Sequence, residues 1–110
     1  MKATAEDRKR LETEAQSLAD QLRALGALQV ILFGSLARGQ VSLFSDIDLL
    51  ALFDRDLPSH ELTRWVYQNI DSGEAVDILA YSQAAFARLR ERPFFLKILS
   101  EGKVLYGPAS

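Results

Sequence analysis

The sequence contains no cysteine, only one histidine and no apolar run of membrane-spanning length. The lack of cysteine excludes disulfides, thiolate nucleophiles and cysteine-based zinc sites. A formal net charge of −2 gives the chain no overall basic character, so we do not expect it to bind DNA directly. The first residues are too polar for a secretory signal. We therefore expect a cytoplasmic protein that does not insert into a membrane.

The length of 110 residues suits a single domain, spanning 1–110, with its own core. A capping-box pattern at Thr4, apolar residues at helical spacing and Gly26 predict an N-terminal helix within 1–26. Strand-like and helix-like segments then alternate as follows: strands at 28–33, 46–53, 74–81 and 104–106, and helices at 36–40, around 62–70, at 82–92 and from 93 to 102. This order predicts an α/β (α+β) fold in which helices flank a small mixed β-sheet.

Acidic residues lie in two of the expected strands. Asp46 and Asp48 are two residues apart, which places both side chains on one face of a strand, and Asp77 lies inside the apolar run 75–79. Neighbouring carboxylates repel one another unless a cation lies between them, and several hard oxygen ligands suit Mg²⁺. Together they predict a site for two metal ions and in-line displacement at phosphorus. Singly, they could instead be a turn cap, a residue at a sheet edge and the ion-pair partner of an arginine.

Gly34 and Ser35 form a sharp turn between an expected strand and a short helix. Such a turn offers backbone N–H groups to an anion, and the serine hydroxyl adds another donor. Many Gly-Ser turns bind nothing, so the turn alone is weak evidence. Ten residues separate it from Asp46, and the combination indicates a site for a nucleoside triphosphate beside the metal.

The motif Gly34-Ser35, ten residues, then Asp46-Ile47-Asp48 resembles the signature of the polymerase-β-like nucleotidyltransferase superfamily. More narrowly, the chain is similar to the minimal nucleotidyltransferase (MNT) antitoxins that accompany HEPN-domain toxins. The resemblance covers 28–106, where it implies the core of a nucleotidyltransferase domain, and leaves 1–26 as an added helix.

The resemblance also implies roles for individual residues. Gly34 and Ser35 would hold the triphosphate, and Asp46 and Asp48 would bind two Mg²⁺ ions. Asp77 would complete the catalytic metal site and help to deprotonate the acceptor hydroxyl. The implied activity is transfer of AMP from ATP to a tyrosine of a cognate HEPN toxin, with which the chain would form a hetero-oligomer.

Two further positions have open interpretations. Arg38 lies one helical turn beyond Gly34, where it could bind a phosphate or form a structural ion pair. Phe94 and Phe95 fall in the last expected helix, and we expect both in the core rather than in contact with a base or a partner.

Three functions remain open from the sequence. The first is an AMP-transferring antitoxin enzyme, which the intact Gly-Ser turn and the three carboxylates favour. The second is an antitoxin that neutralises its partner by binding alone. The third is a nucleotidyltransferase that modifies a small molecule or an RNA end, although the acidic net charge disfavours RNA.

Overall fold

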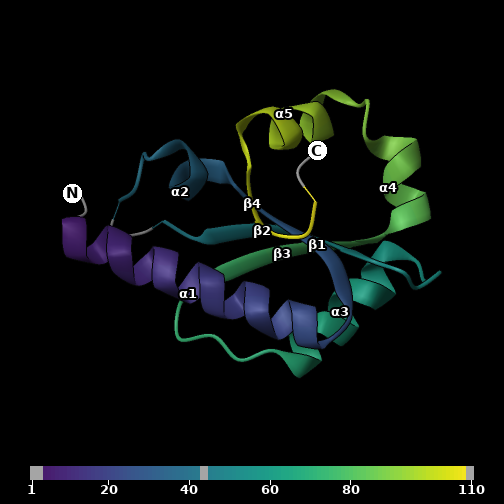
Figure 1. Ribbon diagram of the computed structural model, residues 1–110, viewed down its shortest axis with the longest axis horizontal. Helices are drawn as coiled ribbons and strands as arrows, with labels where there is room; N and C mark the ends of the chain where they lie inside the picture. Colours follow the sequence, from purple (N-terminus) through teal and green to yellow (C-terminus); the bar gives the residue numbers. More distant parts are fainter. Residues whose placement is uncertain (1–3, 43–44, 109–110) are drawn as a thin grey trace.

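The structure, a computed structural model, describes residues 4–42 and 45–108. It contains a four-stranded mixed sheet with helices on both faces (Figure 1). The strands are β1 (Ala27–Phe33), β2 (Ile47–Phe53), β3 (Val76–Ser82) and β4 (Lys103–Tyr106), in the order β3-β2-β1-β4. β1 pairs antiparallel with β2 and with β4, whereas β2 and β3 are parallel. The predicted mixed sheet flanked by helices is confirmed.

Five helices complete the described part of the chain: α1 (Ala5–Ala24), α2 (Gly34–Arg38), α3 (Ser59–Asn69), α4 (Gln83–Leu89) and α5 (Pro93–Glu101). α1 and α3 cover one face of the sheet, and α4 and α5 cover the other (Figure 1). α3 is the crossover that joins the parallel strands β2 and β3. Within the described residues, no helix is long and apolar enough to span a bilayer.

Several helix boundaries follow from local side-chain chemistry. The Asp7 N–H donates to Thr4 Oγ1 at 3.1 Å and the Thr4 N–H donates to Asp7 Oδ2 at 2.9 Å, which completes the predicted capping box of α1. At the start of α4, the Ala85 N–H donates to Ser82 Oγ at 3.1 Å. Pro93 occupies the first turn of α5, where its missing N–H leaves no intrahelical bond unmade.

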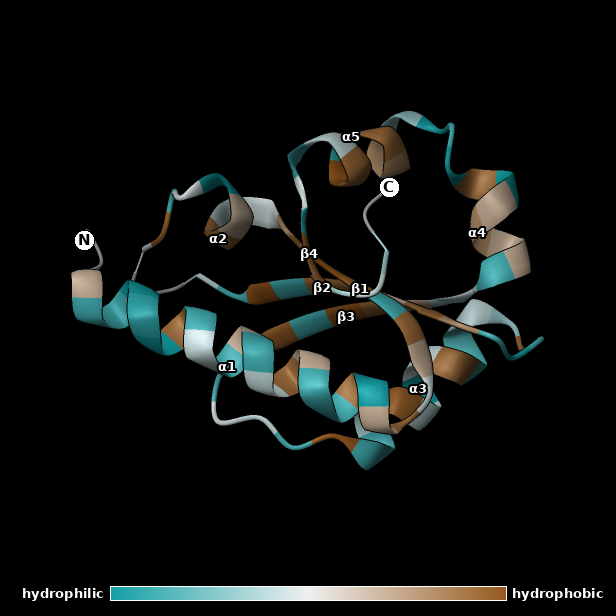
Figure 2. Ribbon diagram, in the orientation of Figure 1, coloured by the Kyte–Doolittle hydropathy of each residue, from teal (hydrophilic) through white to brown (hydrophobic). Residues whose placement is uncertain are grey.

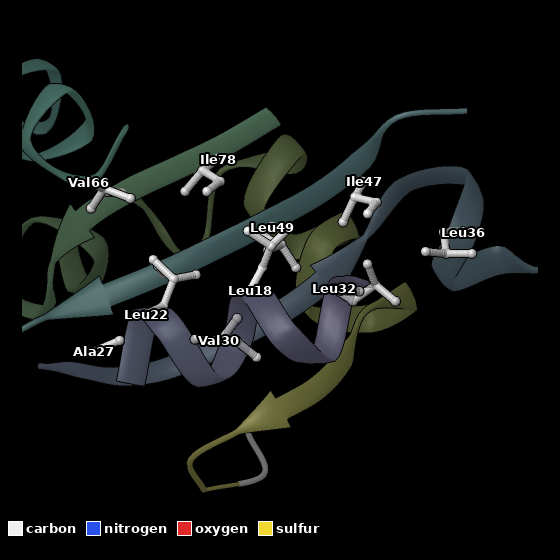
Figure 3. Packing of buried hydrophobic residues seen from close by; sticks show 14 of the residues in the cluster. Leu18, Leu22, Ala27, Val30, Leu32, Leu36, Ile47, Leu49, Val66 and Ile78 are labelled. Carbon is white, nitrogen blue, oxygen red and sulfur yellow. The ribbon is translucent and has the colours of Figure 1, made fainter. Parts of the chain in front are cut away.

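The core is divided by the sheet into two clusters. The larger one lies between the sheet and α1 and α3, where Leu18 and Leu22 of α1 point toward sheet residues such as Leu49 (Figure 3). The smaller one lies under α4 and α5 and includes Leu50 and Phe95. Because successive strand residues face opposite sides, β2 is apolar on both faces except at Asp48, and Figure 2 shows this strand mostly in brown with a teal interruption. The same alternation places the side chain of Asp48, two residues before Leu50, on the face of the sheet that α4 and α5 cover.

Phe94 does not lie in the core. Its side chain is 53% exposed, whereas Phe95 is 7% exposed and packs in the smaller cluster. Adjacent residues on a helix differ by about 100° in direction, so only one of the pair can face the sheet. The prediction that both rings are buried is right for Phe95 and wrong for Phe94.

Candidate functional site

Asp48 and Asp77 lie side by side at one end of the sheet. The two residues are register partners on the parallel strands β2 and β3, and Phe33, at the end of β1, is the partner of Asp48 on its other side. All three occupy positions that alternate away from the larger cluster, so they share the face covered further along by α4 and α5. Residues 29 positions apart in sequence thus come together through strand register.

Asp46 immediately precedes β2. The strand was predicted to begin at Asp46, but it begins at Ile47. Asp46 and Asp77 are exposed and Asp48 is half-buried. Desolvation raises the pKa of the Asp48 carboxyl above its usual value, and the negative charges of Asp77 and Asp46 raise it further, while Arg38 opposes the shift. The three carboxylates therefore interact electrostatically as one group.

No basic side chain in the described part of the chain forms an ion pair with this group. Among the ion pairs and hydrogen bonds between described residues, none involves the carboxylate of Asp46, Asp48 or Asp77. The turn-cap and arginine-pair interpretations of these acids therefore find no contact that supports them in the part of the chain that is described. A half-buried, unpaired carboxylate such as Asp48 is costly unless a cation compensates it.

Gly34 packs against Asp48. The backbone of Gly34 has φ +76°, which side-chain-bearing residues rarely adopt, and a β-carbon at this position would overlap Oδ2 of Asp48 and lie 3.0 Å from its Cγ. The glycine is thus needed twice, once for the turn from β1 into α2 and once to leave space for the carboxylate. The predicted phosphate turn and the predicted metal ligands are in direct contact.

Ser35 is linked to the segment that precedes β2. Its Oγ donates to Ser45 Oγ at 3.4 Å, and Ser45 Oγ also accepts the Ser42 N–H at 2.8 Å. The Gly-Ser turn is therefore linked to Ser45, the residue directly before Asp46. No feature of the sequence singles out Ser45, because only its contact with Ser35 distinguishes it from any other loop serine.

Arg38 forms an ion pair with Glu101 and also lies near the carboxylate of Asp48. Its Nη1 lies 3.4 Å from Glu101 Oε2 in an ion pair whose side chains are each 36% exposed, and its Nε donates to Gln40 Oε1 at 3.4 Å. These contacts are long and partly solvated, so they hold the guanidinium weakly. The same side chain is close enough to Asp48 to lower its pKa. The ion pair is present, and the role in phosphate binding stays a prediction.

The donor set suits Mg²⁺ in kind, because all three side chains are carboxylates and one is half-buried without a counter-charge. The carboxylates are not gathered around a common point: across residues 4–42 and 45–108, no group of three or more His, Cys, Asp or Glu side chains is close enough together to hold a metal ion. Mutual repulsion keeps like charges apart when no cation lies between them.

The chain is similar in sequence or fold to nucleotidyltransferases. The family model described as polymerase beta, nucleotidyltransferase, matches residues 16–109. A candidate nucleotidyltransferase from Sulfolobus solfataricus shares the fold with a TM-score of 0.67 and 20% identity, over 93% of this chain and 85% of that one. A search of curated proteins found no match.

Two toxin–antitoxin structures are also similar. A toxin–antitoxin complex solved with AMP-PNP matches with a TM-score of 0.53 and 25% identity, over 84% of this chain and 73% of the matched one. A tri-AMPylated Shewanella oneidensis HEPN toxin in complex with MNT antitoxin matches with a TM-score of 0.50 and 23% identity, over 89% of this chain and 73% of the matched one.

Proposed function

This chain belongs to the polymerase beta nucleotidyltransferase family, and on that premise we propose that it transfers AMP from ATP to a hydroxyl group of a partner protein. The observation that carries the proposal is the contact between Gly34 and Asp48. It joins the phosphate turn to a carboxylate whose register partner on β3 is Asp77. A nucleotidyltransferase needs these two elements together, because the metal ions must neutralise the phosphates that the turn holds.

Each site residue has a proposed role. Gly34 and Ser35 bind the triphosphate through backbone N–H groups and the serine hydroxyl. Asp46, Asp48 and Asp77 would hold two Mg²⁺ ions, which when bound supply positive charge to the phosphates and the leaving group. Arg38 has a guanidinium near this site that is only weakly engaged by Glu101, and it would add a phosphate contact.

The reaction is an in-line displacement at the α-phosphorus of ATP. The acceptor hydroxyl oxygen forms a bond to this phosphorus, and the bond from phosphorus to the bridging oxygen of the leaving pyrophosphate breaks, the electron pair departing with pyrophosphate. The hydroxyl proton passes to the exposed carboxylate of Asp77 and then to water. Asp77 is suited to this step because it is exposed and has no ion pair with another described residue.

A HEPN toxin is the partner that we propose, with a tyrosine as the acceptor and a cytoplasmic site of action. The likeness to the toxin–antitoxin complex solved with AMP-PNP, at 25% identity, supports a toxin as the partner. The HEPN class of the toxin and the tyrosine acceptor are what the resemblance of the Gly34-Ser35 and Asp46-Ile47-Asp48 motif to the MNT antitoxins implies. AMP on a toxin tyrosine would add phosphate charge and repel an RNA substrate. The chain would therefore act as an antitoxin by covalent modification.

The test asks whether this protein neutralises the toxin when it is present in less than an equimolar amount. Purified toxin is mixed with a tenth as much of this protein and MgATP, and intact mass and residual RNase activity are measured. Complete inactivation with mass gains of whole AMP units supports catalysis, and the variant Asp46→Asn should abolish both.

Neutralisation by binding alone predicts a different result. Inhibition would then follow the molar ratio, require no ATP and survive Asp46→Asn. That outcome would contradict the enzymatic proposal, because each chain would occupy a single partner. Transfer of AMP to an RNA end or a small molecule, with no gain in toxin mass, would instead change the acceptor class and leave the reaction type intact.

A further inference from the structure

A pocket of about 200 Å³ opens between α2 and α5, next to the Gly-Ser turn. Phe33 lines it from the end of β1, and Gly34 and Arg38 line it from the two ends of α2. Its opposite wall is made by α5, a helix to which neither the sequence motif nor the roles above assign any function. The pocket therefore extends the site from the phosphate turn toward a second element.

One face of α5 forms this wall. Phe94, Lys97, Ile98 and Glu101 line the pocket, and their spacing of three and four residues places them on the same side of a helix. Ile98 is buried, whereas the other three side chains are exposed. The wall thus presents one aromatic ring, one cation and one anion beside Gly34.

Of the two charged side chains on this wall, Glu101 forms an ion pair with a described residue and Lys97 does not. Glu101 is paired with Arg38 at 3.4 Å. No ion pair among the described residues involves Lys97, so its ammonium is uncompensated at the rim of the pocket. With Arg38 and Lys97 against Glu101, the groups lining the pocket have a net charge of +1. This charge favours an anion next to the turn that is proposed to hold phosphates.

Phe94 presents an exposed ring on the same wall. The ring is 53% exposed and meets Phe33 and Phe95 in edge-type contacts, with centroids 6.3 Å and 5.2 Å away and interplanar angles of 88° and 79°. These contacts restrain the ring from two sides while leaving half of the side chain uncovered. A restrained, exposed aromatic ring is the kind of surface on which a nucleic-acid base stacks.

We propose that α5 is the second wall of the nucleotide site, with Lys97 contacting the polyphosphate and Phe94 stacking against the base. The proposal rests on the proposed function, since it assumes that ATP binds at the Gly-Ser turn. Three observations support it: Gly34 lines the pocket, Lys97 is one helical turn from Phe94, and the side chains that line the pocket have a positive net charge. Ligand sites commonly reach about 300–1,000 Å³, so a pocket of about 200 Å³ would enclose part of the nucleotide and leave the rest in solvent.

The experiment compares matched pairs of variants. Lys97→Met is paired with Lys103→Met, because Lys103 is an exposed lysine on β4 that does not line the pocket. Phe94→Ala is paired with Leu96→Ala, because Leu96 is 50% exposed on the same helix and does not line the pocket. Calorimetric titrations use MgATP and, separately, magnesium tripolyphosphate, which has the phosphates without the nucleoside. Thermal melts verify that each variant folds.

The two residues have different expected signatures. Lys97→Met should weaken MgATP and tripolyphosphate alike, by roughly tenfold, the effect of one charge-assisted hydrogen bond. Phe94→Ala should weaken MgATP by roughly fivefold to a hundredfold and leave tripolyphosphate unchanged, because only the nucleoside would meet the ring. Both control variants should bind as the wild-type protein does.

The results that overturn the inference are separate from those that overturn the proposed function. If wild-type protein binds no MgATP, the proposed function fails. If wild-type protein binds and Lys97→Met and Phe94→Ala bind equally well, α5 is not part of the nucleotide site and the proposed function stands. Loss of partner binding by Phe94→Ala with unchanged MgATP affinity would assign the ring to the protein partner and contradict the stacking role.

Discussion

The α-carbon of Gly34 faces the carboxylate of Asp48 so closely that a β-carbon would overlap Oδ2. The contact ties the conformation of the turn to the position of a predicted metal ligand. A substitution at either residue should therefore affect the other, and this relationship can be measured.

Gly34→Ala should abolish MgATP binding and destabilise the fold by more than the roughly 1–2 kcal/mol expected for an alanine in left-handed backbone. Gly39→Ala is the matched control. Gly39 has φ +77°, nearly the +76° of Gly34, but its β-carbon would meet only the guanidinium of the exposed Arg8, whose Nη2 would be nearest at 2.8 Å. Denaturant unfolding and calorimetry of both variants give the comparison. Equal stability loss and equal MgATP affinity would show that the Asp48 contact has no consequence.

Asp48→Asn should abolish AMP transfer and leave the metal-free protein as stable as the wild type or more stable. The amide is a poor metal ligand, but removing the charge ends both the desolvation cost and the repulsion with Asp77 and Asp46, which together raise the Asp48 pKa. A gain of about 1 kcal/mol would raise Tm by roughly 4–8 °C in a domain of this size. Melts in EDTA and an AMP-transfer assay test both parts, with exposed Asp54→Asn as the control. Wild-type transfer by Asp48→Asn would refute the assignment.

The stability of the metal-free protein should depend on pH through Asp48. Because the folded-state pKa of Asp48 lies above its ordinary value of 3.8, the folded state takes up this proton before the unfolded state does as the pH falls. This group therefore adds stability as the pH falls through the folded pKa, and the gain is complete below 3.8. Groups such as Asp7, whose pKa is lowered by contacts with Thr4 and Arg10, act in the opposite direction.

This pH effect is measured as the difference in the free energy of unfolding between the wild type and Asp48→Asn. The free energy of unfolding of the wild type minus that of Asp48→Asn, measured in EDTA from pH 7 to pH 4, cancels the contribution of Asp7. The difference should become more favourable to the wild type as the pH falls. A difference that is constant, or that changes in the other direction, would be inconsistent with a raised pKa.

ATP binding should require a divalent cation, with Mg²⁺ preferred and Mn²⁺ able to substitute. Without a cation, the triphosphate would meet the negative charges of Asp46, Asp48 and Asp77 without compensation. Calorimetric titration with and without EDTA is the test, and Ser35→Ala, which removes one donor but no metal ligand, should keep the cation requirement. Equal affinity under both conditions would rule out the metal site.

Arg38→Met distinguishes phosphate binding from a structural ion pair. Breaking the pair with Glu101 should cost at most about 1 kcal/mol of stability, since both side chains are 36% exposed. Glu101→Gln breaks the same pair and keeps the guanidinium. We expect only Arg38→Met to weaken MgATP binding, by roughly tenfold. If both variants lose stability alike and bind MgATP alike, Arg38 is structural.

Most of the elements could be predicted because their signals are local. The capping box at Thr4, Ser82 before α4 and Pro93 at the start of α5 each act within one helical turn. The errors at boundaries are small: β2 begins at Ile47, and the helix expected to reach residue 92 ends at Leu89. Fraying and capping determine such ends, and periodicity alone does not locate them.

The candidate site was predictable only in part. Their chemistry and position in apolar segments are enough to predict Asp46, Asp48 and Asp77 as candidate ligands, but the pairing of Asp48 with Asp77 depends on the parallel register of two strands far apart in sequence. The overlap at Gly34, the hydroxyl contact of Ser45 and the orientation of Phe94 depend on tertiary packing. A pattern with a period of 3.6 residues cannot tell which of two adjacent phenylalanines faces the sheet.

The parallel register of β2 and β3 has a consequence for how this chain avoids misfolding. A slip of β3 by one residue would turn Asp77 toward the larger cluster under α1 and α3 and expose Ile78 in its place. Burying an unpaired carboxylate among leucines costs far more than an apolar mismatch, so this alternative alignment is strongly disfavoured. The same charge that is proposed to serve catalysis thereby selects one alignment of the sheet while the chain folds.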